Sequence, residues 1–475
     1  MISSMRKATS QTSPIVLRPP AFSYRPLSFA AGLTLCCEDA DLAHLADRFG
    51  TPLYVYSAET ICTRLKAFDK AFRVIPHTIC YSVKANSTLA ILRLIAQQSA
   101  GFDVVSGGEL ERVLLVNCKR ASNVVFSGVG KTTAEMELAL TSGILLFNIE
   151  SASELHALAA VAARLKKKAR VAMRVNPDVS AKTHPYISTG LHEHKFGVTI
   201  PEAFKLYAEA AKHPNLRVAG VSVHIGSQIT ELGSFTDALT RVAALVTNLR
   251  RAGHNIQYVD AGGGLGISYQ DPQGIFADQV AAYAKAVTDP LRKLDVHLLL
   301  EPGRSIVGPA GVLITRVIYR KTNNGKRFLI VDAAMNDLLR PSLYGAHHEI
   351  VPIHVLPTLP PCHSVPSAAA LAWRERGRNL HSAPSPEASS HNTELTDVVG
   401  PICETGDFFA RDRELPVIQE GDLLAILDTG AYGSVLASNY NTRSRPAELL
   451  VDGEKARVIQ KRETTRDQLR LESKR

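Results

Sequence analysis

The 475-residue sequence predicts an α/β protein in which a (β/α)8 barrel, also called a TIM barrel, precedes a mostly antiparallel β domain. Three observations predict this fold. Short apolar segments alternate with helical patterns, residues suited to chemistry stand at the C-terminal ends of those segments, and hairpin turns follow the alternating part. Barrel proteins bind their ligands at the C-terminal ends of the strands, so we expect a functional site there.

Eight segments have the composition of buried parallel strands. Their cores are short, rich in β-branched residues and bounded by Gly, Asn, Ser or Pro, which favours strands over helices. They cover residues 77–86, 101–109, 123–131, 145–151, 170–178, 219–228, 256–266 and 296–305. Their total span is close to the roughly 250 residues of a typical barrel, which favours a closed barrel over an open sheet.

The stretches between these segments predict amphipathic helices. Residues 151–169 and 234–253 repeat apolar side chains at spacings of three and four, so one face of each helix would be apolar. Ser151 and Glu154 have the spacing of a capping box, which marks the start of one helix independently of hydrophobicity.

Two turn motifs predict the second domain. Asn324-Gly325 and Asp452-Gly453 each separate two β-rich runs, and both dipeptides favour two-residue hairpins. An insertion at about 356–394 is rich in Pro, Ser and Ala, as expected of a mobile surface segment. We expect a disordered extension over 1–21, a strand joining the β domain over 22–50, the barrel over 51–310, the β domain over 311–462 and a charged tail over 463–475.

Composition argues against several classes of partner. The formal charge is +9, but Lys and Arg are dispersed, so nucleic-acid binding is not expected. No apolar run reaches the roughly 18 residues that span a bilayer, so we expect no membrane segment. Seven cysteines without a CxxC pair indicate reduced thiols and a cytoplasmic protein. Residues 1–37 lack Asp and Glu, so organelle targeting stays open as an alternative.

The strand ends contain groups that could bind a cofactor. Lys84 follows the first strand, where burial and neighbours can lower the pKa of an amine and favour a Schiff base. For this lysine alone, an ordinary surface role is the alternative. The GGGLG sequence at 262–266 follows the seventh strand, near where barrels often bind phosphate.

Further candidates stand at the sixth and eighth strand ends. His224 and Ser227 supply an imidazole and a hydroxyl, while Glu301 and Arg304 supply a carboxylate and a guanidinium. Pyridoxal 5′-phosphate has an aldehyde for lysine, a phosphate for a glycine loop and a ring nitrogen for an acid. The combination therefore predicts this cofactor.

Other ligand motifs are incomplete. The glycine loop lacks the dinucleotide pattern because Ile267 stands where a third glycine is needed, and GKTT at 130–133 is no P-loop because Val125 replaces its first glycine. Histidine pairs at 192/194 and 347/348 have no carboxylate or cysteine at metal-ligand spacing, so we expect no metal site.

Several motifs in a fixed order indicate a family. They are FSYR, FGTPLYVYS, YSVKANS, DVVSGGEL, FSGVGK, HKFG, HIGSQ, GGGLG, EPGRS, LRPSLYGA, DVVGPICETGD and GAYG. Over residues 22–462 the sequence resembles the alanine-racemase-like enzymes that use pyridoxal phosphate, and within them the diaminopimelate decarboxylases. The resemblance implies a barrel with a β domain, and a homodimer in which each partner completes the other's active site. The insertion is longer than the usual connection in this family.

The resemblance also implies roles for residues at the site. Lys84 would bind the cofactor covalently, His224 would lie against its ring and Glu301 would bind its ring nitrogen. The phosphate would be held by Ser227, by Gly262, Gly263 and Gly264, and by the backbone of Glu301, Pro302, Gly303 and Arg304. Substrate carboxylates would bind Arg304, Arg340 and Tyr344, and Tyr432 would contact cofactor and substrate. From the partner subunit, Cys403 would act as the catalytic proton donor and Glu404 would bind the substrate's distal ammonium group.

The implied reaction is decarboxylation of meso-2,6-diaminopimelate to L-lysine and CO2. Three alternatives remain. A decarboxylase for ornithine, arginine or lysine would not need two arginines for a second carboxylate. A racemase usually has a less acidic partner than Glu301 at the ring nitrogen, and a non-catalytic binding protein would tend to lose Lys84 or Cys403.

Overall fold

The computed structural model describes residues 21–27, 32–116, 121–179, 195–269, 276–355 and 393–472. The expected extension over 1–21 and the insertion over 356–394 lie outside these ranges, apart from their last residues. The histidine pair at 192/194 also lies outside them.

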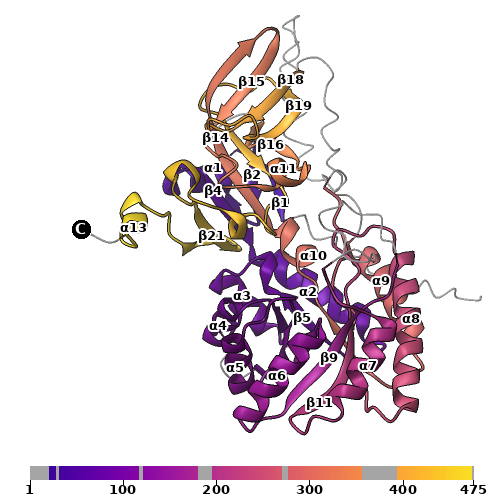
Figure 1. Ribbon diagram of the computed structural model, residues 1–475. Helices are drawn as coiled ribbons and strands as arrows, with labels where there is room; N and C mark the ends of the chain where they lie inside the picture. The colour runs from indigo at the N-terminus through magenta and orange to yellow at the C-terminus, as the bar shows by residue number, and fades with distance from the viewer. Residues whose placement is uncertain are drawn as a thin grey trace, which may run out of the picture.

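Eight parallel strands close into a barrel, as predicted, in the lower part of Figure 1. They are β5 (His77–Ser82), β6 (Gly101–Val104), β7 (Val124–Phe126), β8 (Leu146–Ile149), β9 (Ala169–Asn176), β11 (Leu216–Val223), β12 (Tyr258–Asp260) and β13 (His297–Leu300). Each strand pairs in parallel with the next, and β13 pairs with β5 to close the ring. A short strand, β10 (Val198–Thr199), adds to β9. The strands are shorter than the predicted segments because the C-terminal part of each segment forms a loop, a 3-10 turn or the start of a helix.

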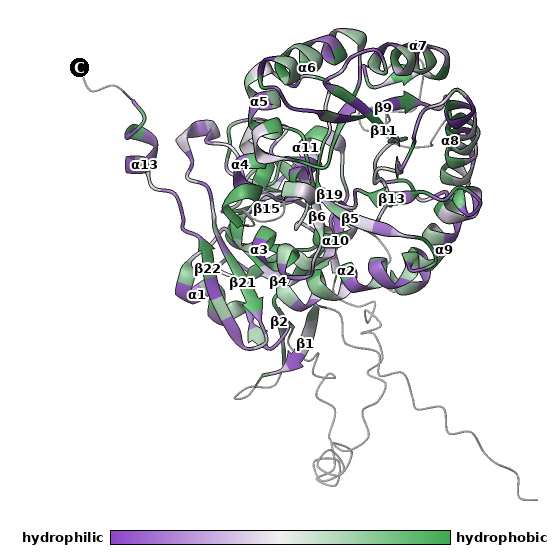
Figure 2. Cartoon of the chain, turned by 90° about the horizontal axis from the view of Figure 1, so that it is seen from below, coloured by the Kyte–Doolittle hydropathy of each residue, from purple (hydrophilic) through white to green (hydrophobic). Residues whose placement is uncertain are grey.

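A ring of helices covers the barrel, and Figure 2 shows it from below. The helices are α3 (Leu89–Gln97), α4 (Gly107–Val116), α5 (Thr133–Ser142), α6 (Ala152–Arg164), α7 (Ile200–Ala210), α8 (Gly233–Arg251) and α9 (Phe276–Thr288). The remaining place is taken by α2 (Ala58–Phe72), which precedes the first barrel strand and packs against α9. Because α2 precedes the first barrel strand, no long helix is needed after β13. The chain continues from there into the second domain.

Only half of the predicted capping box forms at the start of α6. The Ser151 hydroxyl accepts a hydrogen bond from the Glu154 N–H at 3.2 Å. The Glu154 side chain instead accepts from the N–H of Glu150 and pairs with Lys131 at 2.6 Å. The sequence spacing therefore predicted the start of the helix correctly. The second bond of the capping box does not form because the Glu154 carboxylate pairs with the buried Lys131 instead.

The second domain is built on a large, mostly antiparallel sheet. Its strands, in order across the sheet, are β19 (Phe408–Pro416), β18 (Thr393–Val399), β15 (Lys326–Val331), β14 (Gly311–Asn323), β4 (Leu53–Ser57), β21 (Ala447–Asp452) and β22 (Lys455–Gln460). Beside this order, β20 (Leu423–Ile426) pairs with β14, and β16 (Ile350–Pro352) pairs with β20. Asn324-Gly325 connects β14 to β15 and Asp452-Gly453 connects β21 to β22, as their turn chemistry predicts.

The strand β4 belongs to this sheet although it follows residue 51, where we expected the barrel to begin. It pairs antiparallel with β14 and parallel with β21, and all five of its residues are buried. The sheet therefore extends past the expected boundary, and α2 is the first barrel element. A strand buried on both faces has no alternation of apolar and polar residues to distinguish it from a barrel strand.

The N-terminal segment forms more than the single strand expected over 22–50. A small sheet contains β1 (Phe22–Pro26), β2 (Leu33–Cys37), β3 (Ala40–Asp41) and β17 (His354–Val355), and α1 (Leu42–Phe49) follows β3 in the chain.

Three further short α-helices lie in the described chain: α10 (Arg304–Val307), α11 (Arg340–Tyr344) and α13 (Thr465–Leu469), the last within the expected charged tail. Within the residues described, no helix is long and apolar enough to cross a membrane.

Candidate active site

Lys84 lies at the C-terminal mouth of the barrel, in the single helical turn that follows β5. Its ammonium Nζ lies 2.9 Å from Oδ2 of Asp103, which is fully buried on β6, and about a third of the lysine side chain is exposed. The Ser82 hydroxyl donates to the same carboxylate oxygen at 2.8 Å. The lysine is thus held in place by its ion pair with Asp103, with part of its side chain exposed.

The pKa of Lys84 is raised, opposite to our expectation from sequence. Burial by itself would lower the pKa, but the carboxylates of Asp103 and Glu301 outweigh it and stabilise the ammonium form. The expectation was wrong because Asp103 is 19 residues away in the chain and faces Lys84 only once the barrel has closed.

Glu301 lies directly after β13, inside a cluster of buried acids. Its Oε1 accepts a hydrogen bond from the Ser127 hydroxyl at 3.2 Å. Burial raises the pKa of Glu301 well above its usual value, and the carboxylates of Asp103 and Asp260 raise it further. A cationic ring N–H beside Glu301 would stabilise its ionised form, so the acid cluster fits the pyridine nitrogen of pyridoxal phosphate.

Asp260, at the end of β12, belongs to this acid cluster and contacts the glycine loop. It accepts hydrogen bonds from Asn148 at 2.6 Å and from the Gly262 N–H at 2.9 Å. Burial raises the pKa of Asp260. The carboxylate therefore ties the first glycine of the loop to the barrel interior.

The glycine loop packs so closely that side chains would not fit. Gly262 has a φ of +66°, and a Cβ at this position would lie 2.6 Å from the Val223 carbonyl oxygen. A Cβ on Gly263 would lie 2.2 Å from the Glu301 carbonyl oxygen. Bare backbone thus brings 262–264 against the segment 301–304, which supports a shared phosphate cradle.

His224 follows β11 and faces the same loop. Its Nδ1 accepts a hydrogen bond from the Gly263 N–H at 3.2 Å, which requires a neutral imidazole with its hydrogen on Nε2. Burial lowers the pKa of His224 to about 3, and the positive charges of Arg174 and Lys84 lower it in the same direction. A neutral, flat ring at this position suits packing against an aromatic cofactor.

Arg304 and Arg340 are buried with few exposed atoms, at 7% and 5% of their surface. Among the described residues neither forms an ion pair, and Nε of Arg304 is buried without a hydrogen-bond partner. Arg304 donates from Nη2 to the Ser227 hydroxyl at 3.2 Å. Tyr344 lies one turn after Arg340 on α11, so the two side chains share a face of that helix.

Tyr432 connects the two domains at the site. Its backbone N–H donates to the carbonyl of Ala85, beside Lys84, at 2.8 Å. The Arg304 guanidinium carbon lies 4.9 Å from the centre of the Tyr432 ring. The β domain thus brings an aromatic ring against Arg304 and the loop that holds Lys84.

Cys403 and Glu404 lie on an exposed loop between β18 and β19. Glu404 accepts a hydrogen bond from the Tyr440 hydroxyl at 2.8 Å, and the neighbouring Gly406 carbonyl accepts one from Ser342 at 2.5 Å. Among the described residues, no hydrogen bond or ion pair joins Cys403 or Glu404 to Lys84 or Glu301. One chain thus brings the other candidates together but leaves these two on its surface.

Three residues at the site were not singled out from the sequence: Asp103, Asp260 and Tyr269. His348 was considered there only as part of a histidine pair for a metal ion, and its contact with Arg340 was not expected. The two aspartates had a detectable signal, since each interrupts an otherwise apolar strand segment. Tyr269 and His348 had none, because their partners are arginines distant in the chain.

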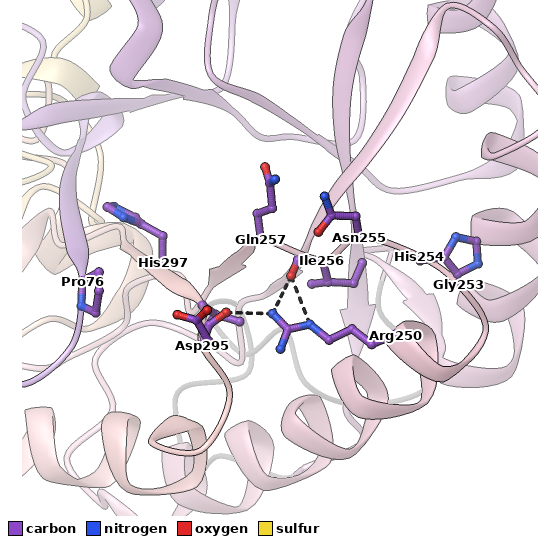
Figure 3. Close-up of a pocket in the computed structure, with 10 residues that line it drawn as sticks. Pro76, Arg250, Gly253, His254, Asn255, Ile256, Gln257, Asp295 and His297 are labelled. Carbon is purple, nitrogen blue, oxygen red and sulfur yellow. Dashed lines mark hydrogen bonds between the residues drawn. The ribbon is translucent and has the colours of Figure 1, made fainter.

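A separate hollow of about 660 Å³ lies at the opposite end of the barrel (Figure 3). It is lined by loops that precede β12 and β13. Arg250 donates to the carbonyls of Ile256 and Asp295 there, at 2.6 and 2.8 Å, so the arginine joins the two loops. The hollow is distant from the strand ends that hold Lys84 and Glu301. In the described part of the chain, no cluster of three or more His, Cys, Asp or Glu side chains could hold a metal ion.

Comparisons with known proteins agree with this geometry. Residues 58–308 match the family described as pyridoxal-dependent decarboxylase, pyridoxal binding domain. The chain is 48% identical to the diaminopimelate decarboxylase of Pseudomonas aeruginosa, across 94% of this chain and 97% of that protein. It is also 48% identical to the enzyme of that name from Vibrio cholerae, across 92% and 96%.

A solved structure shows the same fold. Helicobacter pylori diaminopimelate decarboxylase complexed with L-lysine superposes with a TM-score of 0.80 and 40% identity. The match covers 91% of this chain and 99% of that one. The likeness therefore includes both the barrel and the β domain.

Proposed function

Because the chain belongs to the diaminopimelate decarboxylase family of pyridoxal-dependent enzymes, we propose that it converts meso-2,6-diaminopimelate to L-lysine and CO2. This reaction is the last step of lysine biosynthesis. The proposal concerns the substrate, the roles of the site residues and the assembly, each of which has its own support.

The pair of buried arginines is the single observation that supports this substrate best. Burying a guanidinium without an opposite charge is unfavourable, and here two are buried without an ion pair among the described residues. The retained carboxylate of diaminopimelate would supply the missing charge. Arginine suits this role because its planar fork binds a carboxylate through two hydrogen bonds.

Pyridoxal 5′-phosphate is the cofactor of this family, and the site fits it. When bound, the cofactor accepts the electron pair left behind by the departing CO2. Lys84 would hold its aldehyde, His224 would pack against its ring and Glu301 would face its nitrogen. The phosphate would lie between the glycine loop, Ser227 and the backbone of residues 301–304.

We propose a homodimer in which the partner subunit completes each site. In this arrangement Cys403 of one subunit delivers a proton to the reacting carbon in the other, and Glu404 binds the distal ammonium group of the substrate. Both side chains are exposed, and among the described residues no hydrogen bond or ion pair joins them to Lys84 or Glu301, which supports the proposal. Tyr432 and Tyr344 would complete the substrate pocket from the subunit that holds Lys84.

Decarboxylation of ornithine, arginine or lysine is the main alternative hypothesis. The single carboxylate of these amino acids is the group that leaves as CO2, so they have no second carboxylate to balance the charge of the two arginines. A racemase is disfavoured because the carboxyl group of Glu301 would face the ring nitrogen, where a racemase usually has a less acidic partner. Turnover distinguishes these reactions directly.

The test is release of CO2 and L-lysine from meso-diaminopimelate by the purified protein with pyridoxal phosphate. L-ornithine, L-arginine and L-lysine serve as competing substrates, and Lys84→Ala is the matched inactive variant. We expect turnover of diaminopimelate alone, lowered at least about a thousandfold in Lys84→Ala because covalent attachment is lost. Turnover of another amino acid would refute the substrate, and no turnover at all would favour a binding protein.

A further inference from the structure

Tyr269 lies between the two buried arginines of the site. Its hydroxyl oxygen accepts a hydrogen bond from Nη1 of Arg304 at 2.7 Å. The guanidinium carbon of Arg340 lies 5.0 Å from the centre of the same ring. A tyrosine ring has a negative face that attracts cations, so one uncharged side chain binds both arginines.

His348 holds Arg340 from the other side. Nη1 of Arg340 donates to Nε2 of His348 at 2.8 Å, and Nδ1 of the imidazole donates to the Leu427 carbonyl at 2.7 Å. These two bonds require a neutral ring with its hydrogen on Nδ1. His348 is fully buried and meets the Tyr269 ring edge-on, with ring centres 5.2 Å apart.

The groups that hydrogen-bond to the two arginines or stack on them are therefore neutral. The carboxylate of Asp428 interacts electrostatically with Arg64 and Arg340, but among the described residues it forms no ion pair with Arg340. Ser227 and Tyr432 complete the set around Arg304. A carboxylate at any of these positions would pair with a guanidinium and compete with an anionic ligand. Neutral acceptors instead orient each guanidinium group without neutralising its charge, so both positive charges can bind an anionic ligand.

We infer that Tyr269 and His348 are positioning residues that orient Arg304 and Arg340 for the carboxylate the substrate retains, and that they thereby determine its specificity for a dicarboxylic amino acid. The inference rests on the proposed function and deepens it. Neither residue needs to touch the reacting carbon, so their loss should weaken substrate binding more than it slows the chemical step.

The experiment compares Tyr269→Phe with wild-type holoenzyme in two measurements. The first is the split between KM and kcat for meso-diaminopimelate. The second is the ratio of the affinities for L-lysine and cadaverine, two diamines that differ only in the carboxylate. Phe keeps the ring under Arg340 and removes the hydroxyl, which accepts a hydrogen bond from Arg304 and also interacts with Arg340. We expect KM to rise roughly tenfold, with kcat within about threefold, and the L-lysine preference to fall by a similar factor.

His348 provides an independent arm. His348→Leu removes the acceptor for Arg340 and should raise KM in the same way, whereas His348→Gln retains an acceptor and should restore most of the affinity. The matched controls are Tyr258→Phe, at the opposite end of β12, and His347→Leu, which contacts Glu349 and Arg413 instead. The absorbance of the bound cofactor should be the same in all variants.

The outcomes separate this inference from the proposed function. An unchanged L-lysine preference in both Tyr269→Phe and His348→Leu would overturn the inference, even if diaminopimelate is the substrate. Equal weakening of L-lysine and cadaverine would overturn it as well, because the effect would then be general damage to the site. If the wild type failed to decarboxylate diaminopimelate while the carboxylate preference still depended on Tyr269, only the proposed function would fail.

Discussion

At the scale of single residues, the site is controlled by which side chains keep or lose their charge on burial. Lys84 keeps its charge because Asp103 and Glu301 surround it. His224 and His348 lose theirs, since burial and nearby cations lower the pKa of each to about 3. Each neutral imidazole accepts a hydrogen bond that a protonated ring could not accept. The neutral state of each histidine is therefore required by the hydrogen bond that the ring accepts.

The two histidines predict how stability changes with pH. Their pKa values are near 3 when folded and about 6.5 when unfolded, so the unfolded chain binds more protons between these values. Stability from this source is complete above pH 6.5 and is lost as the pH falls toward 3. His348→Gln should make the loss shallower by about 1.4 kcal/mol per pH unit, measured by urea unfolding from about pH 4.5 to 7.

The matched control for this measurement is His347→Gln, whose side chain is about a third exposed. It should follow the wild-type pH dependence more closely than His348→Gln does. If the wild type and His348→Gln lost stability with the same slope, the neutral buried imidazole would be contradicted.

At the scale of elements, the loop after β12 and the turn after β13 form one unit. Gly262 and Gly263 allow their backbones to meet at distances that exclude any side chain. Asp260 fixes one end of the unit through the Gly262 N–H. The turn at the other end contacts the end of β5, since the Ser82 N–H donates to the Pro302 carbonyl. Displacement of one loop should therefore displace the phosphate cradle as a whole.

Gly263→Ala tests this coupling. The new Cβ would lie 2.2 Å from the Glu301 carbonyl oxygen, so the backbone must shift. We expect a loss of roughly 1–3 kcal/mol in stability, together with weaker retention of pyridoxal phosphate. Thermal unfolding and cofactor absorbance after dialysis measure the two effects. Gly233→Ala is the control, because nothing lies within 4 Å of its added Cβ. Wild-type cofactor retention by Gly263→Ala would argue against the cradle.

At the scale of the whole molecule, the barrel and the β domain share the site. The Tyr432 N–H and the Asn86 side chain link the loop after β20 to the loop after β5. The candidate proton donor Cys403 is exposed on the loop between β18 and β19. The proposed homodimer would bring the Cys403 loop of one subunit to the barrel mouth of the other.

Mixing two inactive variants tests the shared site. Lys84→Ala and Cys403→Ala should regain up to about a quarter of wild-type activity after subunit exchange, because each mixed dimer has one intact site. Lys84→Ala mixed with Arg340→Ala should regain none, since both residues belong to the site of a single chain. Recovery in the second mixture, or in neither mixture, would contradict the proposed arrangement.

The sequence by itself determined the local features of this protein. Alternating apolar segments and helical patterns predicted the eight-stranded barrel, and the Asn-Gly and Asp-Gly turns predicted the two hairpins. Motifs such as GGGLG and EPGRS identified the strand ends where a cofactor would bind. These features depend on residues that are neighbours in the chain, so their signals survive without a structure.

Only the tertiary structure decided how distant residues act on one another. It placed β4 in the second sheet, paired Asp103 with Lys84 and raised the pKa of that lysine instead of lowering it. It also brought Tyr269 and His348 to the two buried arginines. Burial and long-range contacts arise when the chain closes on itself, and a charge is stabilised or removed according to those contacts. No local pattern in the sequence contains that information.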